Sequence, residues 1–179
     1  GQFRALAGTS TGDRTLGAEL NNLGTLEVAL VASSTFTLSK ASAHHSNGSL
    51  IDLNGGIFTI TQNGTAPSFA NSGTIDGTGG GDVTISGGTF TNTGTLSVAS
   101  GRTLALQSIV FNNLLGGTFG GGGTTLSLSN TTMNATPDYS TAGSTVLMNS
   151  STWNGPGTFT NASTTVLAKQ YDTYHPFPD

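Results

Sequence analysis

Apolar positions recur along the chain at an interval of about 21 residues. Phe69, Phe90 and Phe111 are evenly spaced at this interval, and an asparagine follows each of them two positions later. These asparagines are Asn71, Asn92 and Asn113. A fixed interval of this length, made of short alternating apolar runs broken by Gly and Asn, is the sequence signature of a solenoid, in which similar coils stack on one another.

The residues between the apolar positions favour strands and turns over helices. Thr, Ser, Gly and Asn dominate them, whereas a helical solenoid needs a longer repeat made of good helix formers. Within one repeat the apolar residues form three short runs, around Phe90, around Leu96 and Val98, and around Leu104 and Leu106. The pattern predicts an all-β fold: a single-stranded β-solenoid (β-helix) of triangular cross-section, with about 20–22 residues and roughly three short strands per coil.

The same pattern sets the expected boundaries of the solenoid. Alternating apolar residues begin after Asn21, and Leu126, Val146 and Val166 later recur at an even and slightly shorter interval. We therefore expect residues 21–168 to form the solenoid, residues 1–20 a less regular N-terminal segment, and residues 169–179 an extended tail. Residues that recur at one position should stack into ladders inside the coils. The expected ladder residues are Phe69, Phe90, Phe111, Asn71, Asn92, Asn113, Leu126, Val146 and Val166.

Composition narrows the range of partners. Only 8% of the 179 residues are charged, the formal net charge is −4, and the five basic residues are scattered, so no basic patch is available to bind nucleic acid. No apolar run is long enough to span a bilayer. The chain has no cysteine, which excludes disulfides and thiolate metal sites. Abundant Thr, Ser, Gly and Asn with few charges favour an extracellular location, on a bacterial cell surface.

The ends of the predicted rod point to a function. An uncovered β-solenoid end exposes unpaired backbone groups, and no stretch of this chain has the pattern of an amphipathic capping helix. Residues 171–179 contain two prolines and several aromatic side chains, which predicts an extended strand suited to a neighbouring molecule. We expect head-to-tail assembly with copies of the same chain, since such contacts generate filaments. The expected inter-subunit residues are Phe3, Leu6, Tyr171, Tyr174 and Phe177.

The repeated motif Asn-x-Gly-Thr-Leu/Ile, together with Gly-Gly-Thr-Phe, resembles the repeat regions of bacterial secreted β-helical surface proteins, such as autotransporter passengers and filamentous-haemagglutinin-like adhesins. The resemblance covers roughly residues 21–168. It implies a structural role at the cell surface, in contact with a host or a neighbouring cell, and it transfers no catalytic residue.

Residue types that carry chemistry are present but scattered. Asp76 and Asp82 are the closest acidic pair in the middle of the chain, and carboxylates without a defined separation are weak evidence for acid–base catalysis. His44 and His45 lack a third metal ligand. The run from Gly79 to Asp82 occurs once, whereas a calcium-binding glycine-rich repeat needs successive copies. We therefore expect a protein that is not an enzyme and that holds no metal or cofactor.

Three functions fit this pattern. The first is a structural subunit of an extracellular bacterial filament. The second is a surface adhesin domain whose outer face binds a host glycan or protein. The third is ice binding by a flat array of threonines, because Thr-x-Thr pairs recur along the chain, although at uneven spacing. These pairs are Thr35/Thr37, Thr59/Thr61, Thr89/Thr91 and Thr158/Thr160.

Overall fold

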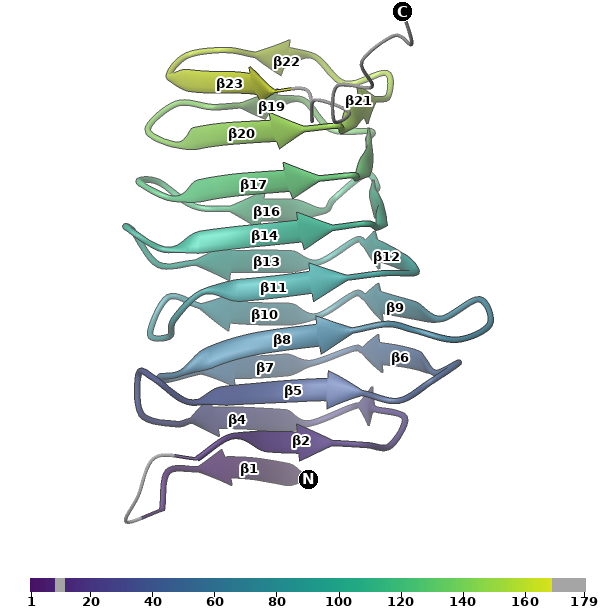
Figure 1. Cartoon of the computed structure of the whole chain (residues 1–179), viewed down its shortest axis with the longest axis vertical. Helices are drawn as coiled ribbons and strands as arrows, with labels where there is room; N and C mark the ends of the chain where they lie inside the picture. The colour runs from purple at the N-terminus through teal and green to yellow at the C-terminus, as the bar shows by residue number, and fades with distance from the viewer. Residues whose placement is uncertain (9–11, 169–179) are drawn as a thin grey trace, which may run out of the picture.

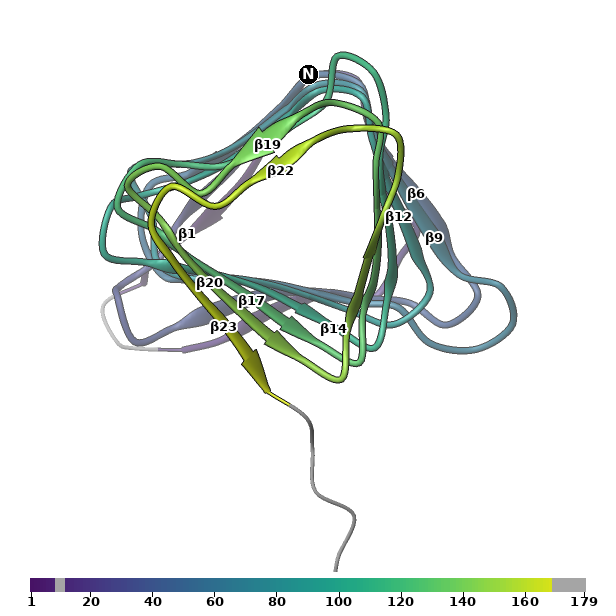
Figure 2. The ribbon, with the colours of Figure 1, turned by 90° about the horizontal axis from the view of Figure 1, so that it is seen from above.

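The chain winds into a right-handed β-solenoid with a triangular cross-section (Figures 1 and 2). The computed structural model describes residues 1–8 and 12–168, and all of the regular structure in these ranges is strand. Strands of successive coils lie parallel and in sequence order within each sheet, and they make about seven coils. The all-β solenoid expected from the sequence is confirmed.

Three parallel sheets form the sides of the triangle. Sheet A contains β1 (Gln2–Leu6), β4 (Thr25–Ala29), β7 (Leu50–Leu53), β10 (Thr74–Gly77), β13 (Thr95–Val98) and β16 (Thr118–Gly120). Sheet B contains β2 (Arg14–Leu16), β5 (Thr35–Ser39), β8 (Ile57–Thr61), β11 (Val83–Ser86), β14 (Thr103–Gln107), β17 (Thr125–Ser129), β20 (Thr145–Asn149) and β23 (Thr164–Ala168). Sheet C contains β3 (Asn21–Asn22), β6 (His44–Asn47), β9 (Ser68–Asn71), β12 (Thr89–Asn92), β15 (Val110–Asn113), β18 (Thr132–Ala135) and β21 (Thr152–Asn154).

A fourth, two-stranded sheet completes the last coils. It pairs β19 (Tyr139–Ser140) with β22 (Phe159–Thr160), and it continues the side of the triangle that sheet A occupies (Figure 2).

The coils keep their register although their lengths differ. In sheet B, Val83 pairs with Phe58 in the preceding coil and with Leu104 in the following one, so the first of these two coils contains more residues than the second. The extra residues lie in the loops at the corners, so inward and outward side chains still alternate along the strands of the central coils. The even interval expected from the sequence therefore describes only some of the coils.

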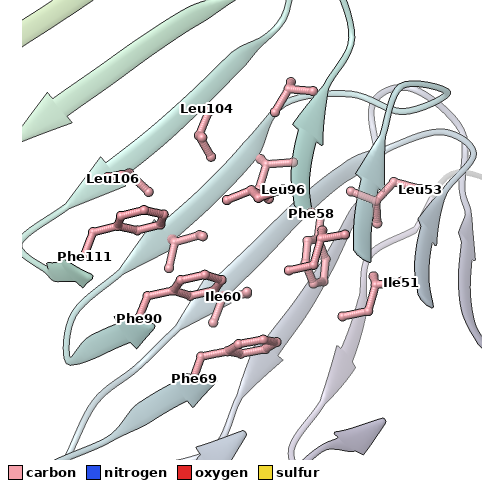
Figure 3. Packing of buried hydrophobic residues seen from close by; sticks show 14 of the residues in the cluster. Ile51, Leu53, Phe58, Ile60, Phe69, Phe90, Leu96, Leu104, Leu106 and Phe111 are labelled. Carbon is pink, nitrogen blue, oxygen red and sulfur yellow. The ribbon is translucent and has the colours of Figure 1, made fainter. Parts of the chain in front are cut away.

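Stacked phenylalanines form one inner row of the core (Figure 3). Phe69, Phe90 and Phe111 lie opposite one another on β9, β12 and β15. Their ring centroids are 5.0 and 5.3 Å apart, and the planes of adjacent rings differ by 11° and 3°. All three side chains are buried, as are the expected ladder residues Leu126 and Val146 on sheet B. A single coil is too thin to bury these side chains alone. Stacking of the coils buries them, and this burial stabilises the fold.

A row of buried asparagines runs beside the phenylalanines, at the corner between sheets C and A. The Nδ2 group of each asparagine except the last donates a hydrogen bond of 2.7–2.8 Å to the Oδ1 atom of the asparagine in the next coil. The row comprises Asn22, Asn47, Asn71, Asn92 and Asn113. It therefore adds two members to the three expected from the sequence.

The glycine of each Asn-x-Gly corner permits this close stacking. A Cβ atom added to Gly94 would overlap the carbonyl oxygen of Gly73 in the preceding coil.

Val166 lies outside the core row to which the sequence pattern assigns it. β23 pairs with β20 so that Thr165 lies opposite Val146, while Val166 lies opposite Leu147 on the outer face. The side chain of Val166 is 45% exposed. The reason is that the last coil, from Val146 to Thr165, is shorter than the coil before it, from Leu126 to Val146. A shift of a single position moves a side chain to the other face of a strand.

The solenoid begins before residue 21. β1 and β2 both lie within residues 1–20, and they pair with β4 and β5 as the first strands of sheets A and B. The repeat is hard to recognise there because Arg14 stands at the register position that Phe36 holds in the next coil.

Candidate functional site

The N-terminal end of the solenoid is an open, largely apolar hollow. β1, β2 and β3 are the end strands of their sheets, so each pairs with a neighbour on one side only within the described residues. Phe3 lies opposite Leu26 in the inner row, yet its side chain is 50% exposed because no described residue covers it. The residues that line the hollow are Gly1, Gln2, Phe3, Leu16, Leu20, Asn21, Asn22, Leu23, Gly24 and Thr25.

The C-terminal end of the described coils is open in the same way. β21, β22 and β23 are end strands, and β23 is five residues long and carries no charged side chain. Leu167 lies opposite Met148 in the inner row, but it is 75% exposed. The hollow at this end is lined by Met148, Trp153, Phe159, Thr165 and Leu167.

The two ends of the described coils expose opposite edges of parallel sheets. All strands of the solenoid run parallel within their sheets, so the last coil presents the edge that the first coil of an identical molecule would pair with. Such a contact joins two different faces, which makes it heterologous and able to propagate.

Arg14 places a charged side chain in the first coil of sheet B. Its position faces inward, in register with Phe36, but the side chain is exposed. The guanidinium Nη1 group donates hydrogen bonds to the carbonyl oxygens of Gly12 and Asp13, at 3.1 and 3.0 Å. The charge is thereby held at the rim of the hollow, beside the loop that precedes β2.

The five expected inter-subunit residues have different positions. Phe3 lines the N-terminal hollow, whereas Leu6 lies opposite Ala29 on the outer face of sheet A. Tyr171, Tyr174 and Phe177 lie outside the described residues.

The sequence pattern missed several residues of the two hollows. Leu16, Leu20, Phe159 and Leu167 line them, and each is an apolar residue in the first or last coil. These residues could be found from the sequence only by locating the inward positions of the first and last coils. That requires the length of each coil, which a fixed repeat interval does not give.

Asp76 and Asp82 make separate hydrogen bonds, on sheet A and before the first residue of β11. Asp76 faces outward on β10, where it accepts hydrogen bonds from the Thr78 hydroxyl at 2.7 Å and the Ser97 hydroxyl at 3.1 Å. These bonds, led by that from Thr78, lower the pKa of Asp76, which opposes a role as a general acid. Asp82 instead precedes β11 and accepts the backbone N–H of Thr103.

The adjacent histidines point in different directions. His44 is exposed and its Nδ1 atom lies 2.9 Å from the Ser68 hydroxyl, while His45 is buried in the inner row beside Phe69. Within the described ranges, no three His, Asp or Glu side chains are grouped so that they could bind a metal ion.

Comparisons with known proteins add no family to this picture. The chain matches no family model, no curated protein and no solved structure. Among residues 1–8 and 12–168, no helix is long and apolar enough to cross a membrane. The class of protein is therefore given by its fold: a right-handed β-solenoid whose described coils are open at both ends.

Proposed function

We propose that this chain is a structural, non-enzymatic subunit that assembles head to tail with identical copies into a filament. The observation that carries the proposal is the pair of open ends, each of which combines end strands with exposed inner-row side chains. Stacking the last coil of one copy on the first coil of another would pair the strand edges and bury Phe3 against the hollow that contains Leu167.

The proposed location is the exterior of a bacterial cell. The support for it is the composition, which is rich in Thr, Ser, Gly and Asn and poor in charge, and the resemblance of the Asn-x-Gly-Thr motif to secreted β-helical surface proteins. An extracellular protein built from stacked coils in register suits a mechanical role better than a catalytic one, given the scattered acids and histidines.

Charged substitutions at the two ends test the assembly. Phe3→Lys and Leu167→Lys each place an ammonium group in an inner row that stacking would bury, so each variant should abolish filaments seen by negative-stain electron microscopy. The matched control is Leu115→Lys, because Leu115 is 81% exposed in the loop between β15 and β16 and lies at neither end. This control should form filaments like the unmodified chain.

A mixing experiment distinguishes a head-to-tail contact from a symmetric one. Phe3→Lys leaves the C-terminal end intact, and Leu167→Lys leaves the N-terminal end intact, so an equimolar mixture should form a dimer of one copy of each. Light scattering after size-exclusion chromatography would measure this dimer. Only monomers in the mixture, with both variants folded by circular dichroism, would refute a head-to-tail contact.

A further inference from the structure

The outer face of sheet B differs from the other two sides of the triangle. Its outward side chains on β5, β8, β11, β14 and β17, which we call the threonine face, are uncharged and mostly hydroxylated. They are Thr35, Thr37, Ser39, Ile57, Thr59, Thr61, Thr84, Ser86, Thr103, Ala105, Gln107, Thr125, Ser127 and Ser129. Thr37, Thr59 and Thr84 lie directly opposite one another along the middle of the face.

The hydroxyl groups of these threonines have no protein partner within the described residues. The hydrogen bonds of Thr35 and Thr103 involve their backbone N–H groups, and a side-chain bond on this face is made by Ser86, whose hydroxyl donates to the carbonyl oxygen of Ile60. The threonine hydroxyls are therefore free to bond to water.

The outward polar groups of sheets A and C are used differently. On sheet A, Glu27 binds Arg4, and Asp76 accepts a bond from Ser97. On sheet C, amide groups bond across coils in the row Asn112, Asn134 and Asn154. Several polar side chains of these two faces therefore bond to one another, whereas the threonine hydroxyls of sheet B are left to the solvent.

Charged side chains lie on the outer face of sheet A and at the margin of the threonine face. Sheet A carries Glu27, Asp52 and Asp76 in one outward row. Beside the threonine face, Asp13 and Asp82 stand just before β2 and β11, and their carboxylates accept the backbone N–H groups of Thr35 and Thr103, each at 2.8 Å. The strands between these margins carry no charged side chain.

The threonine face is a regular array, because its strands keep one register from coil to coil. Parallel strands lie about 4.8 Å apart, and alternate residues along a strand lie about 6.6 Å apart, so the hydroxyl and methyl groups repeat in two directions. The buried Phe and Asn ladders hold the coils in register, and sheet B forms one side of the triangle, whose strands turn gradually from coil to coil (Figure 2).

We infer that the threonine face binds the surface of ice. A regular array of unpaired hydroxyls can order water into a two-dimensional lattice, and the adjacent methyl groups favour release of disordered water. The absence of charge on its strands matters, because a charged group holds its own hydration shell. The face carries no aromatic side chain, which is the usual platform for stacking on a sugar ring. This inference does not depend on head-to-tail assembly.

Thermal hysteresis of the purified chain tests the inference. We expect the unmodified protein to separate the melting and freezing temperatures and to shape ice crystals. Thr59→Lys, in the middle of the face, should remove most of this activity. The matched control is Thr91→Lys, which makes the same change at an outward position of β12 on sheet C and should retain the activity.

Each contrary result would overturn the inference. They are an absence of thermal hysteresis in the unmodified protein, or equal activity in the Thr59 and Thr91 variants. If Thr59→Lys does not fold by circular dichroism, Thr84→Lys on the neighbouring strand provides the same test, since it changes the same row. The outcome is separate from that of the filament experiment, because all the substituted residues lie on the sides of the solenoid.

Discussion

At the scale of single residues, the buried asparagines are the most specialised groups of the core. A primary amide both donates and accepts, so a row of amides can satisfy itself as long as each member is present. In the central coils the Nδ2 group also donates to a backbone carbonyl: that of Asn92 reaches the Thr118 oxygen at 2.9 Å. This bond connects the end of β12 on sheet C to the first residue of β16 on sheet A.

Removing one amide from the middle of the row should be costly. Asn92→Ala removes one of the two acceptors of the Asn71 Nδ2 group, leaves the Oδ1 atom of Asn113 without its donor, and creates a small cavity. We expect a loss of about 2–4 kcal/mol in the free energy of unfolding, measured by urea denaturation. The outward neighbour Thr91→Ala is the control and should change it by less than about 0.5 kcal/mol. Equal effects at the two positions would refute the structural role of the ladder.

His45 should make the stability of the chain depend on pH. Burial lowers the pKa of His45, although the nearby Glu19 carboxylate partly opposes this, and the Nδ1 atom accepts the backbone N–H of Leu20 at 3.0 Å. Because protonation is easier in the unfolded chain, the stabilising contribution of neutral His45 is complete above pH of about 6.5 and is lost as the pH falls through the folded-state pKa.

Thermal unfolding at several pH values measures this effect. We expect the midpoint to fall between pH 7 and about pH 5 in the unmodified chain and in the control His44→Ala, because His44 is exposed. His45→Phe should flatten the curve, since it replaces the titrating group of this inner row with a ring like that of Phe69. A curve that is unchanged by His45→Phe would contradict the assignment.

At the scale of strands, the coils are held together by ladders of identical or similar side chains. The stacked rings of Phe69, Phe90 and Phe111 connect three successive coils on one side of the triangle. Each sheet is buried on one face only, so buried and outward side chains alternate along its strands. The strands are short because the chain turns a corner between one sheet and the next.

Phe90→Ala should therefore weaken the central coils. The side chain is fully buried between two other rings, so its removal leaves a cavity that the stacked strands cannot close. We expect a loss of about 3–5 kcal/mol in the free energy of unfolding, measured by chemical denaturation. Val110→Ala, at an outward and partly exposed position on the adjacent strand, is the control and should cost far less.

The strands and most of the inner rows could be predicted from the sequence, because the sequence repeats. Three phenylalanines at one interval define an inner row, and the asparagines two positions later define the corner. The prediction failed at Val166, because the interval between Leu126 and Val146 did not hold in the last coil. It also missed the first coil, because Arg14 interrupts the inner row there. Loops that change length between coils hide the register from a count along the chain.

The threonine face shows the same limit. The Thr-x-Thr pairs are unevenly spaced in the sequence, which obscured their common location. The structure places Thr35/Thr37 and Thr59/Thr61 on sheet B, adds Thr84, Thr103 and Thr125 to them, and assigns Thr89/Thr91 to sheet C. Spatial neighbours from different coils become visible only when the corner loops are placed.

At the scale of the whole molecule, the solenoid is a stack in which each coil contacts mainly the coils before and after it. Its stability is therefore approximately a sum of contributions from coils and from the interfaces between them, and the two terminal coils have one interface fewer. A further copy at either end would supply that interface, which is the physical reason to expect assembly from the open ends.

Electron microscopy of the purified, unmodified chain tests the proposed assembly most directly. The account predicts unbranched filaments with an axial repeat of about 34 Å per subunit, because about seven coils stack at roughly 4.8 Å per coil. A uniform population of separate single-chain particles, even at high protein concentration, would contradict it.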